Sequence, residues 1–375
     1  MSINQEAAGI DVISAVDQRI EVVRTQSLDL SFNELLDMYA NDELIISPDY
    51  QRLFRWSEGK QSRLIESLIL EMPLPPLFVI ERAQGAYELI DGLQRLSSYI
   101  HFRGLLRDEG GEPLEGLALS ECDIVPELNG LTYETLPRAL AIKLKRAFVR
   151  VEVIRKESDP RLRYYMFKRL NTGGELASEQ EIRNCTIRLL DPAFNEFVAT
   201  LSRNEDFKTC IAYLSEEKRK EKYDQELVLR FFAFKNDMPT YVHNIGDFLT
   251  EYMEKVSSKS VPFEYQNEQD QFERTFRILR MTLGENAFTG VVAGERRPAQ
   301  FLSLHYEAFA LSLIPHLGII DSDDAGQIAR IRERFEGVKR DGEFREMTTG
   351  GGKNFRRMLE RRIEFVTREV SAAVE

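Results

Sequence analysis

The chain has 375 residues, 43% of them hydrophobic and 30% charged, and this length suits two domains or one domain with a large extension. The formal net charge of −12 argues against a protein that coats nucleic acid over its whole surface. No apolar stretch reaches the length needed to span a membrane, and the first residues lack the pattern of a secretory signal.

Helices and strands are both predicted between residues 31 and 190. Ser31-Phe32-Asn33-Glu34 is a capping box that opens a helix through about residue 39. Ser57 caps a second helix, which Pro73 ends. Strand-like runs are predicted at 77–81, 87–90 and 148–154. Further helices are predicted at 136–145, at 159–170, and after a second capping box at Ser178-Glu179-Gln180-Glu181.

Beyond about residue 190 the strand signals fade and only helical periodicity remains. Helical runs are predicted at 193–202, 216–235, 245–256, 268–283, 299–314, 323–337 and 353–371. The sequence therefore predicts an α+β protein with a small mixed-sheet domain at 1–190 and an all-helical domain at 191–375.

One stretch, 87–104, reads as a strand, a tight turn and a helix. Asp91 is placed to cap the helix, and Gly92 permits a sharp turn and the approach of a ligand. Gln94 and Arg95 fall in the first helical turn, where free amides and the helix dipole favour an anion. Arg95 adds a guanidinium suited to phosphate. The simpler alternative is an ordinary turn with a solvated arginine.

Other blocks accompany this turn in a fixed order: Tyr50-Gln51-Arg52, Pro73-Leu74-Pro75-Pro76, Asn171-Thr172-Gly173-Gly174 and Gln180-Glu181-Ile182-Arg183-Asn184. Over roughly 28–184 the set resembles the N-terminal, ParB/sulfiredoxin-like domain of the GmrSD-type restriction and phage-defence proteins. The family's usual Asp-Gly-Gln-Gln-Arg motif (DGQQR) has Leu93 in place of its first Gln here. Phosphate binding is still expected with this change, but efficient turnover comes into question.

The resemblance implies a nucleotide-binding, NTP-hydrolysing component of a bacterial DNA-restriction or phage-defence system. Its catalytic residues would be Asp91, Gln94 and Arg95. Its nucleotide pocket would contain Tyr50, Gln51, Arg52, Gly92, Asn171, Thr172 and Gly173. The implied cofactors are a nucleoside triphosphate of unknown base and Mg²⁺, and no protein metal site is expected. The alternative is a non-hydrolysing, ParB-like DNA-binding regulator that uses nucleotide as a switch.

A basic run lies at 138–169, where eleven Lys or Arg accompany three acidic residues. Such a region can contact phosphates even on an acidic protein, which makes Lys143, Lys145 and Arg146 candidate DNA-binding residues. The alternative is a solvated face of two helices.

The cysteines and histidines form no recognisable site. Cys122, Cys185 and Cys210 are far apart, which argues against disulfides or a cysteine zinc site and fits a reducing cytoplasm. The four histidines, His101, His243, His305 and His316, are scattered and match no nuclease core. A nuclease with an unrecognised site is therefore disfavoured.

Relatives often carry a separate HNH nuclease domain, which is not expected here, so the predicted partners include DNA and a separate nuclease or defence subunit.

Overall fold

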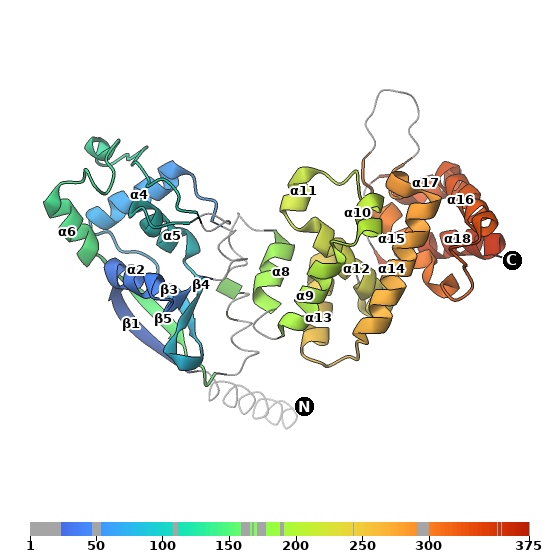
Figure 1. Ribbon diagram of the computed structural model, residues 1–375, viewed down its shortest axis with the longest axis horizontal. Helices are drawn as coiled ribbons and strands as arrows, with labels where there is room; N and C mark the ends of the chain where they lie inside the picture. Colours follow the sequence, from blue (N-terminus) through green and yellow to red (C-terminus); the bar gives the residue numbers. More distant parts are fainter. Residues whose placement is uncertain are drawn as a thin grey trace, which may run out of the picture. The chain divides into compact units, whose positions relative to one another are not determined.

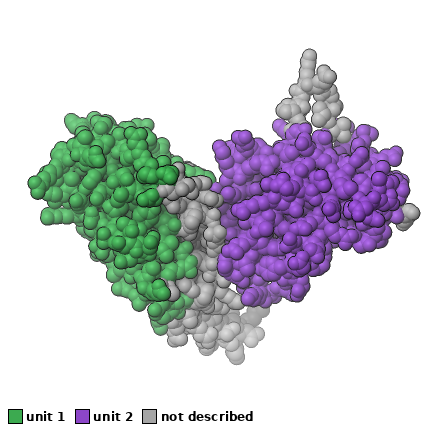
Figure 2. Space-filling model, viewed as in Figure 1, with its two compact units in different colours: residues 1–177 green, residues 178–375 purple. Residues whose placement is uncertain are grey.

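The computed structural model describes residues 24–46, 54–107, 112–158, 166, 169–170, 178–187, 191–242, 244–290, 300–350, 352–353 and 355–374. The chain divides into two compact units, residues 1–177 and 178–375 (Figure 2). The helix opened by the second capping box therefore belongs to the second unit, although the sequence analysis had placed it in the first. Within the described residues, no helix combines the length and apolar character needed to cross a membrane.

The first unit is built on a five-stranded sheet in the order β1-β5-β3-β4-β2 (Figure 1). The strands are β1 Thr25–Ser31, β2 Leu44–Ile45, β3 Leu77–Glu81, β4 Tyr87–Asp91 and β5 Phe148–Ile154. Strand β5 runs antiparallel to β1 and parallel to β3, while β4 runs antiparallel to β3 and parallel to β2. The sheet is therefore mixed, as predicted.

The helices of the first unit are α2 Phe32–Ala40, α4 Glu58–Ile69, α5 Leu93–Phe102 and α6 Arg138–Arg146, with 3-10 turns η1 Ala83–Gly85 and η2 Pro126–Leu128. Figure 1 shows α2, α4 and α5 gathered on one side of the sheet. Strand β5 has the matching alternation, because Val149, Val151 and Val153 are buried while Phe148 and Arg150 are exposed. One face of the sheet thus forms the core with these helices.

The predicted helix starts are confirmed by their hydrogen bonds. The Ser31 hydroxyl accepts from the Glu34 N–H at 3.0 Å, and the Ser57 hydroxyl accepts from the Lys60 N–H at 3.3 Å. Strand β1 escaped prediction because it is a mostly exposed edge strand with a polar sequence, and it is held by pairing with β5 more than a hundred residues later. Most of the helix predicted at 159–170 lies outside the described residues.

The second unit is helical. Its helices are α8 Glu179–Ile187, α9 Pro192–Leu201, α10 Glu205–Cys210, α11 Glu216–Lys220, α12 Tyr223–Asp237, α13 Ile245–Ser257, α14 Tyr265–Thr282, α15 Ser303–Ser312, α16 Ala325–Arg340, α17 Gly342–Thr348 and α18 Arg356–Val374, with 3-10 turns η3 Met238–Thr240, η4 Gly284–Asn286 and η5 Ile314–His316. The run predicted at 216–235 is two helices, because Lys222 adopts a left-handed φ of 60° between them.

Two helices form the centre of the second unit. Residues 226–234 of α12 and 305–312 of α15 are buried on every side of their helices. Around them pack aromatic rings, such as Phe231 with Phe272 at 5.3 Å and Phe207 with Phe276 at 4.9 Å between centroids. The α+β class, with a helical second region, is thereby confirmed.

Candidate functional site

The predicted turn between strand and helix is present, and its geometry depends on Gly92. This residue follows β4 and begins α5 with φ 100° and ψ 14°, a left-handed conformation that favours glycine. A Cβ at this position would lie 2.1 Å from Cδ2 of Leu77, whose side chain is buried. The turn therefore requires glycine both for its backbone angles and for packing. The space beside its Cα is filled by Leu77, whereas the sequence analysis had left it for a ligand.

Asp91 does not cap helix α5 as expected. The helix begins at Gly92 without a side-chain cap from the described residues, and one Asp91 carboxylate oxygen instead accepts from Nη2 of Arg95 at 2.9 Å. Burial raises the pKa of Asp91 above its ordinary value, and the attraction of Arg95 offsets this only in part. The result is an ion pair across the first turn of the helix.

Arg95 is held by more than its carboxylate partner. Its Nη1 donates to the backbone carbonyl of Pro75 and to that of Pro76, the latter at 3.2 Å. Its side chain is only 13% exposed. The guanidinium therefore connects the start of α5 to the proline-rich segment that precedes β3. It is held in one orientation by these contacts and is not freely solvated.

Gln94 organises a second segment at the same turn. Its side-chain oxygen accepts from the backbone N–H groups of Arg55 and Trp56, both at 3.1 Å. A further chain of hydrogen bonds supports this segment, because Gln61 donates to the Trp56 carbonyl at 2.8 Å and also contacts His101 Nδ1 at 2.8 Å. Gln94 thus positions the chain directly after the predicted Tyr50-Gln51-Arg52 block.

The structure brings together part of the predicted site. Asp91, Gly92, Gln94 and Arg95 lie at one turn, with Arg55 and Trp56 held beside them. Leu93, where the family motif has Gln, is 3% exposed, so its side chain belongs to the core. The remaining predicted site residues lie outside the described residues, and these are Tyr50, Gln51, Arg52, Asn171, Thr172 and Gly173.

Comparison with known families gives a match that covers most of this unit. Residues 32–188 match the family model described as the GmrSD restriction endonuclease, N-terminal domain. The chain therefore carries a GmrSD N-terminal domain. No curated protein and no solved structure matches the chain. The domain indicates a component of a restriction or phage-defence system, while the ParB/sulfiredoxin likeness stays a prediction.

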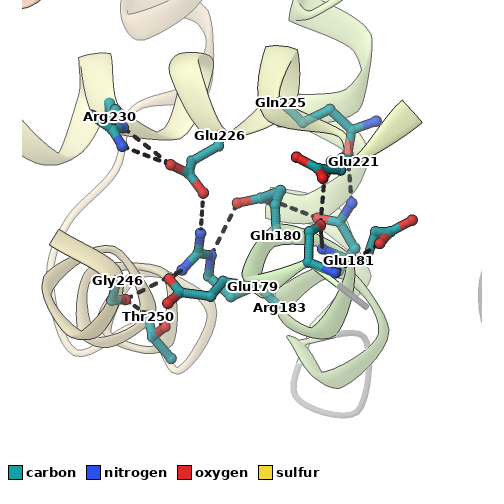
Figure 3. A network of polar contacts seen from close by, with 12 residues as sticks. Glu179, Gln180, Glu181, Arg183, Glu221, Gln225, Glu226, Arg230, Gly246 and Thr250 are labelled. Atoms are coloured by element: carbon teal, nitrogen blue, oxygen red, sulfur yellow. Dashed lines mark hydrogen bonds and ion pairs between the residues drawn. The ribbon is translucent and has the colours of Figure 1, made fainter. Parts of the chain in front are cut away.

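The GmrSD match extends into α8, whose polar side chains form a network in the second unit (Figure 3). Arg183 pairs with Glu226 of α12 at 2.6 Å and donates to the Gly246 carbonyl of α13 at 3.3 Å. Asn184 donates to Gln225 at 2.6 Å, and Ser178 with Glu181 forms the predicted reciprocal capping box. These contacts fix α8 to α12 and α13, a structural role that the sequence analysis had not assigned.

The basic run of the GmrSD domain is partly neutralised by ion pairs. Lys143 lies 3.5 Å from Glu71, and Arg150 lies 3.1 Å from Asp29 on the neighbouring strand. Lys145 and Arg146 are exposed at the end of α6, and they form no ion pair within the described part of the chain. These two residues are therefore the better DNA-contact candidates of the predicted three.

The histidines described in the structure lie in separate structural contacts. His101 contacts Gln61 and the Glu115 carbonyl, and His316 lies 3.2 Å from the Ser371 hydroxyl. His305 is 4% exposed and packs on Phe344 with ring centroids 5.3 Å apart. His243 lies outside the described residues. Groups of three or more His, Cys, Asp or Glu that could hold a metal are absent from the described part of the chain.

Because His305 is buried, we expect the folded protein to lose stability in mild acid. Burial lowers its pKa from 6.5 to about 3, so the folded chain does not take up the proton that the unfolded chain binds below pH 6.5. Stability should therefore fall as pH drops from 6.5 toward 3, by ~1.4 kcal/mol per pH unit at most. Urea unfolding at pH 7.5 and 5.0 measures this, and His305→Gln should show a smaller difference. Equal pH dependence in both proteins would contradict it.

Proposed function

We propose that the chain is the nucleotide-binding component of a DNA-restriction or phage-defence system, and that nucleotide phosphates bind at the start of α5. The observation that supports this most strongly is a fixed guanidinium, Arg95, beside a helix whose first turn has no side-chain cap in the described structure. Uncapped helix N-termini and preorganised arginines both favour phosphate. The GmrSD match supplies the biological setting.

In this proposal each described residue of the turn has a defined role. Arg95 neutralises phosphate charge, and Gly92 gives the turn its shape. Gln94 positions the segment at Arg55 and Trp56 across the turn. Asp91 orients Arg95 and, in hydrolysis, accepts the proton of the water that attacks phosphorus while the phosphoanhydride P–O bond breaks. A raised pKa makes Asp91 a better base for that step than an ordinary carboxylate.

Mg²⁺ fits the described residues poorly. Asp91 is the carboxylate of this turn, and one of its oxygens already accepts from Arg95. Mg²⁺ in nucleotide sites is bound by one or two carboxylates together with phosphates and water. The turn therefore offers few ligands of its own to the metal, and phosphate release with and without Mg²⁺ measures whether hydrolysis needs it.

A second candidate function is a regulator that binds nucleotide as a switch without hydrolysing it. The burial of Leu93 favours this alternative, because the first position of α5 then offers no polar group to the site. The charged groups that remain, Asp91 and Arg95, are paired with each other at 2.9 Å. Such an arrangement is suited to binding more than to activating water.

Nucleotide binding and turnover can be measured separately on the full chain. Trp56 is the single tryptophan and is positioned by Gln94, so its fluorescence should change when nucleotide binds. Each of the four ribonucleoside triphosphates is titrated with and without Mg²⁺, and phosphate release is followed with and without DNA. Binding with turnover supports the hydrolase, and binding without turnover supports the switch. Absence of binding for all four would overturn both.

We also propose that the chain acts on DNA with a separate nuclease or defence subunit, because the matched family is a restriction endonuclease. Exposed Lys145 and Arg146 are the residues of α6 best placed for sequence-independent phosphate contacts. Both residues lie in the GmrSD domain, so the proposed DNA contact is on this domain.

Charge reversal on α6 should weaken DNA binding. Lys145→Glu with Arg146→Glu is expected to lower affinity and to reduce the salt slope by roughly 2, since each phosphate contact contributes about 0.9. Anisotropy of a labelled duplex at several salt concentrations measures both quantities. The matched control is Arg203→Glu with Lys220→Glu, which changes the net charge equally at exposed positions of the second unit. If the two double variants behave alike, α6 is a solvated face.

A further inference from the structure

The second unit contains a cavity whose lining is unusually rich in cationic and hydroxyl groups. Its volume is about 230 Å³, and it lies among α12, α13, α15 and α18. Its lining residues include Tyr223, Arg230, Tyr241, Ser303, Glu307 and Arg362. Arg230 and Arg362 are 9% and 1% exposed, so their guanidinium groups are held inside the protein.

The buried charges around this cavity do not balance. Arg183, Glu226, Arg230, Glu307 and Arg362 form one chain of ion pairs, part of which appears in Figure 3. This chain contains three arginines and two glutamates. The partner that would balance it, Glu179, lies 3.3 Å from Arg183 but is 71% exposed, so water screens its charge. A buried net positive charge is costly unless an anion compensates it.

Glu307, the acidic group among the described residues of the cavity lining, is already neutralised. Glu307 places one carboxylate oxygen 3.0 Å from Arg230 Nη1 and the other 3.2 Å from Arg362 Nη2. An anion in the cavity would therefore meet a carboxylate that is shared by two arginines. Nε of Arg362 is buried and has no hydrogen-bond partner among the described residues. A bound anion could accept a hydrogen bond from this buried N–H group.

Two further features of the lining suit an oxyanion. Ser303 is the first residue of α15, and the start of that helix has no side-chain cap in the described structure. The helix dipole therefore adds partial positive charge at this end of the cavity. The hydroxyl groups of Tyr223 and Ser303 are paired with each other, so one of them donates to the other and the pair keeps one O–H that can donate to a ligand.

We propose that this cavity is a second anion site, which binds an oxyanion of the phosphate class independently of the turn at Arg95. Its donors come from α12, α15 and α18, so a bound anion would join three helices of the second unit. The volume lies below the range of about 300–1,000 Å³ that drug-sized ligands need. Inorganic phosphate or a small phosphate ester therefore fits better than a whole nucleotide.

The test measures thermal unfolding of the full chain in rising concentrations of inorganic phosphate at constant ionic strength, with chloride as the matching anion. Trp56 reports the first unit, while helical circular dichroism is dominated by the second unit. We expect phosphate to raise the melting temperature of the second unit, because a ligand that binds only the folded state stabilises it. Equal melting in phosphate and chloride would overturn the proposal, because a cavity that holds only water has no such preference.

Three variants locate the effect. Tyr223→Phe and Ser303→Ala each remove one hydroxyl of this pair, which disrupts the donor that the pair offers to a ligand, and each should weaken phosphate binding roughly three- to ten-fold in calorimetric titration. Arg362→Gln should abolish phosphate binding. If the Arg362→Gln protein fails to fold, Tyr223→Phe and Ser303→Ala still test whether the anion binds in this cavity. Arg95→Ala, which alters the first unit, should leave this phosphate effect unchanged. A phosphate effect that survives Tyr223→Phe and Ser303→Ala but disappears in Arg95→Ala would place the anion elsewhere and overturn the proposal.

Discussion

Replacing Glu226 by Gln is expected to lower the free energy of unfolding of the second unit by about 3–5 kcal/mol. Its side chain is 12% exposed, and its carboxylate contacts Arg183 at 2.6 Å and Arg230 at 2.8 Å. The neutral amide would leave two buried guanidinium groups without their counter-charge, and breaking a buried pair in this way has costs of that size. The melting temperature of the unit should fall by on the order of ten degrees.

The two units can be followed separately in this experiment. Helical circular dichroism mainly follows the second unit, whereas Trp56 fluorescence follows the first and should be unaffected. Glu205→Gln is the matched control, because the Glu205–Lys208 pair has a similar distance of 2.9 Å but Glu205 is 85% exposed. It should shift stability by at most ~0.5 kcal/mol. If Glu226→Gln melts like the parent, the network in Figure 3 does not hold α8 to α12.

Replacing Arg95 by Ala is expected to lower nucleotide affinity roughly ten- to a hundred-fold, which is what a lost charge-assisted contact of about 1.5–3 kcal/mol produces. Because Arg95 also bonds Asp91, Pro75 and Pro76, the first unit should melt at a lower temperature as well. The contacts of its guanidinium make some loss of stability unavoidable.

Two further variants separate the role of Arg95 in binding from its role in stability. Arg103 ends the same helix and bonds Asn33 and Tyr99 at 3.2 and 3.0 Å, so Arg103→Ala should destabilise the unit without changing nucleotide affinity. Asp91→Asn keeps the shape of its side chain, and it should retain binding but lose turnover. Trp56 fluorescence measures both melting and affinity. An Arg95→Ala protein that binds nucleotide like the parent would show that the phosphates lie elsewhere.

Much of this protein follows from local sequence. The capping boxes at Ser31 and Ser178, the strand at 148–154 and the turn at Gly92 were all predictable, because each depends on residues within a few positions of one another. The order of the motif blocks also indicated the GmrSD domain that the family match then showed. Local hydrogen-bonding preferences and the spacing of motifs are properties of the chain itself.

The partners of charged side chains depended on the tertiary structure. Nothing near Arg95 in sequence indicates that its guanidinium reaches the carbonyls of Pro75 and Pro76, or that Asp91 pairs with it instead of capping the helix. Likewise the Arg183–Glu226 and Arg362–Glu307 pairs join residues 43 and 55 positions apart. A charge is stabilised by whichever opposite charges or carbonyls folding brings within a few ångströms, and burial removes the water that would otherwise satisfy it. Only the packed structure could therefore show which arginines are held by carboxylates or carbonyls, and that Nε of Arg362 has no hydrogen-bond partner among the described residues.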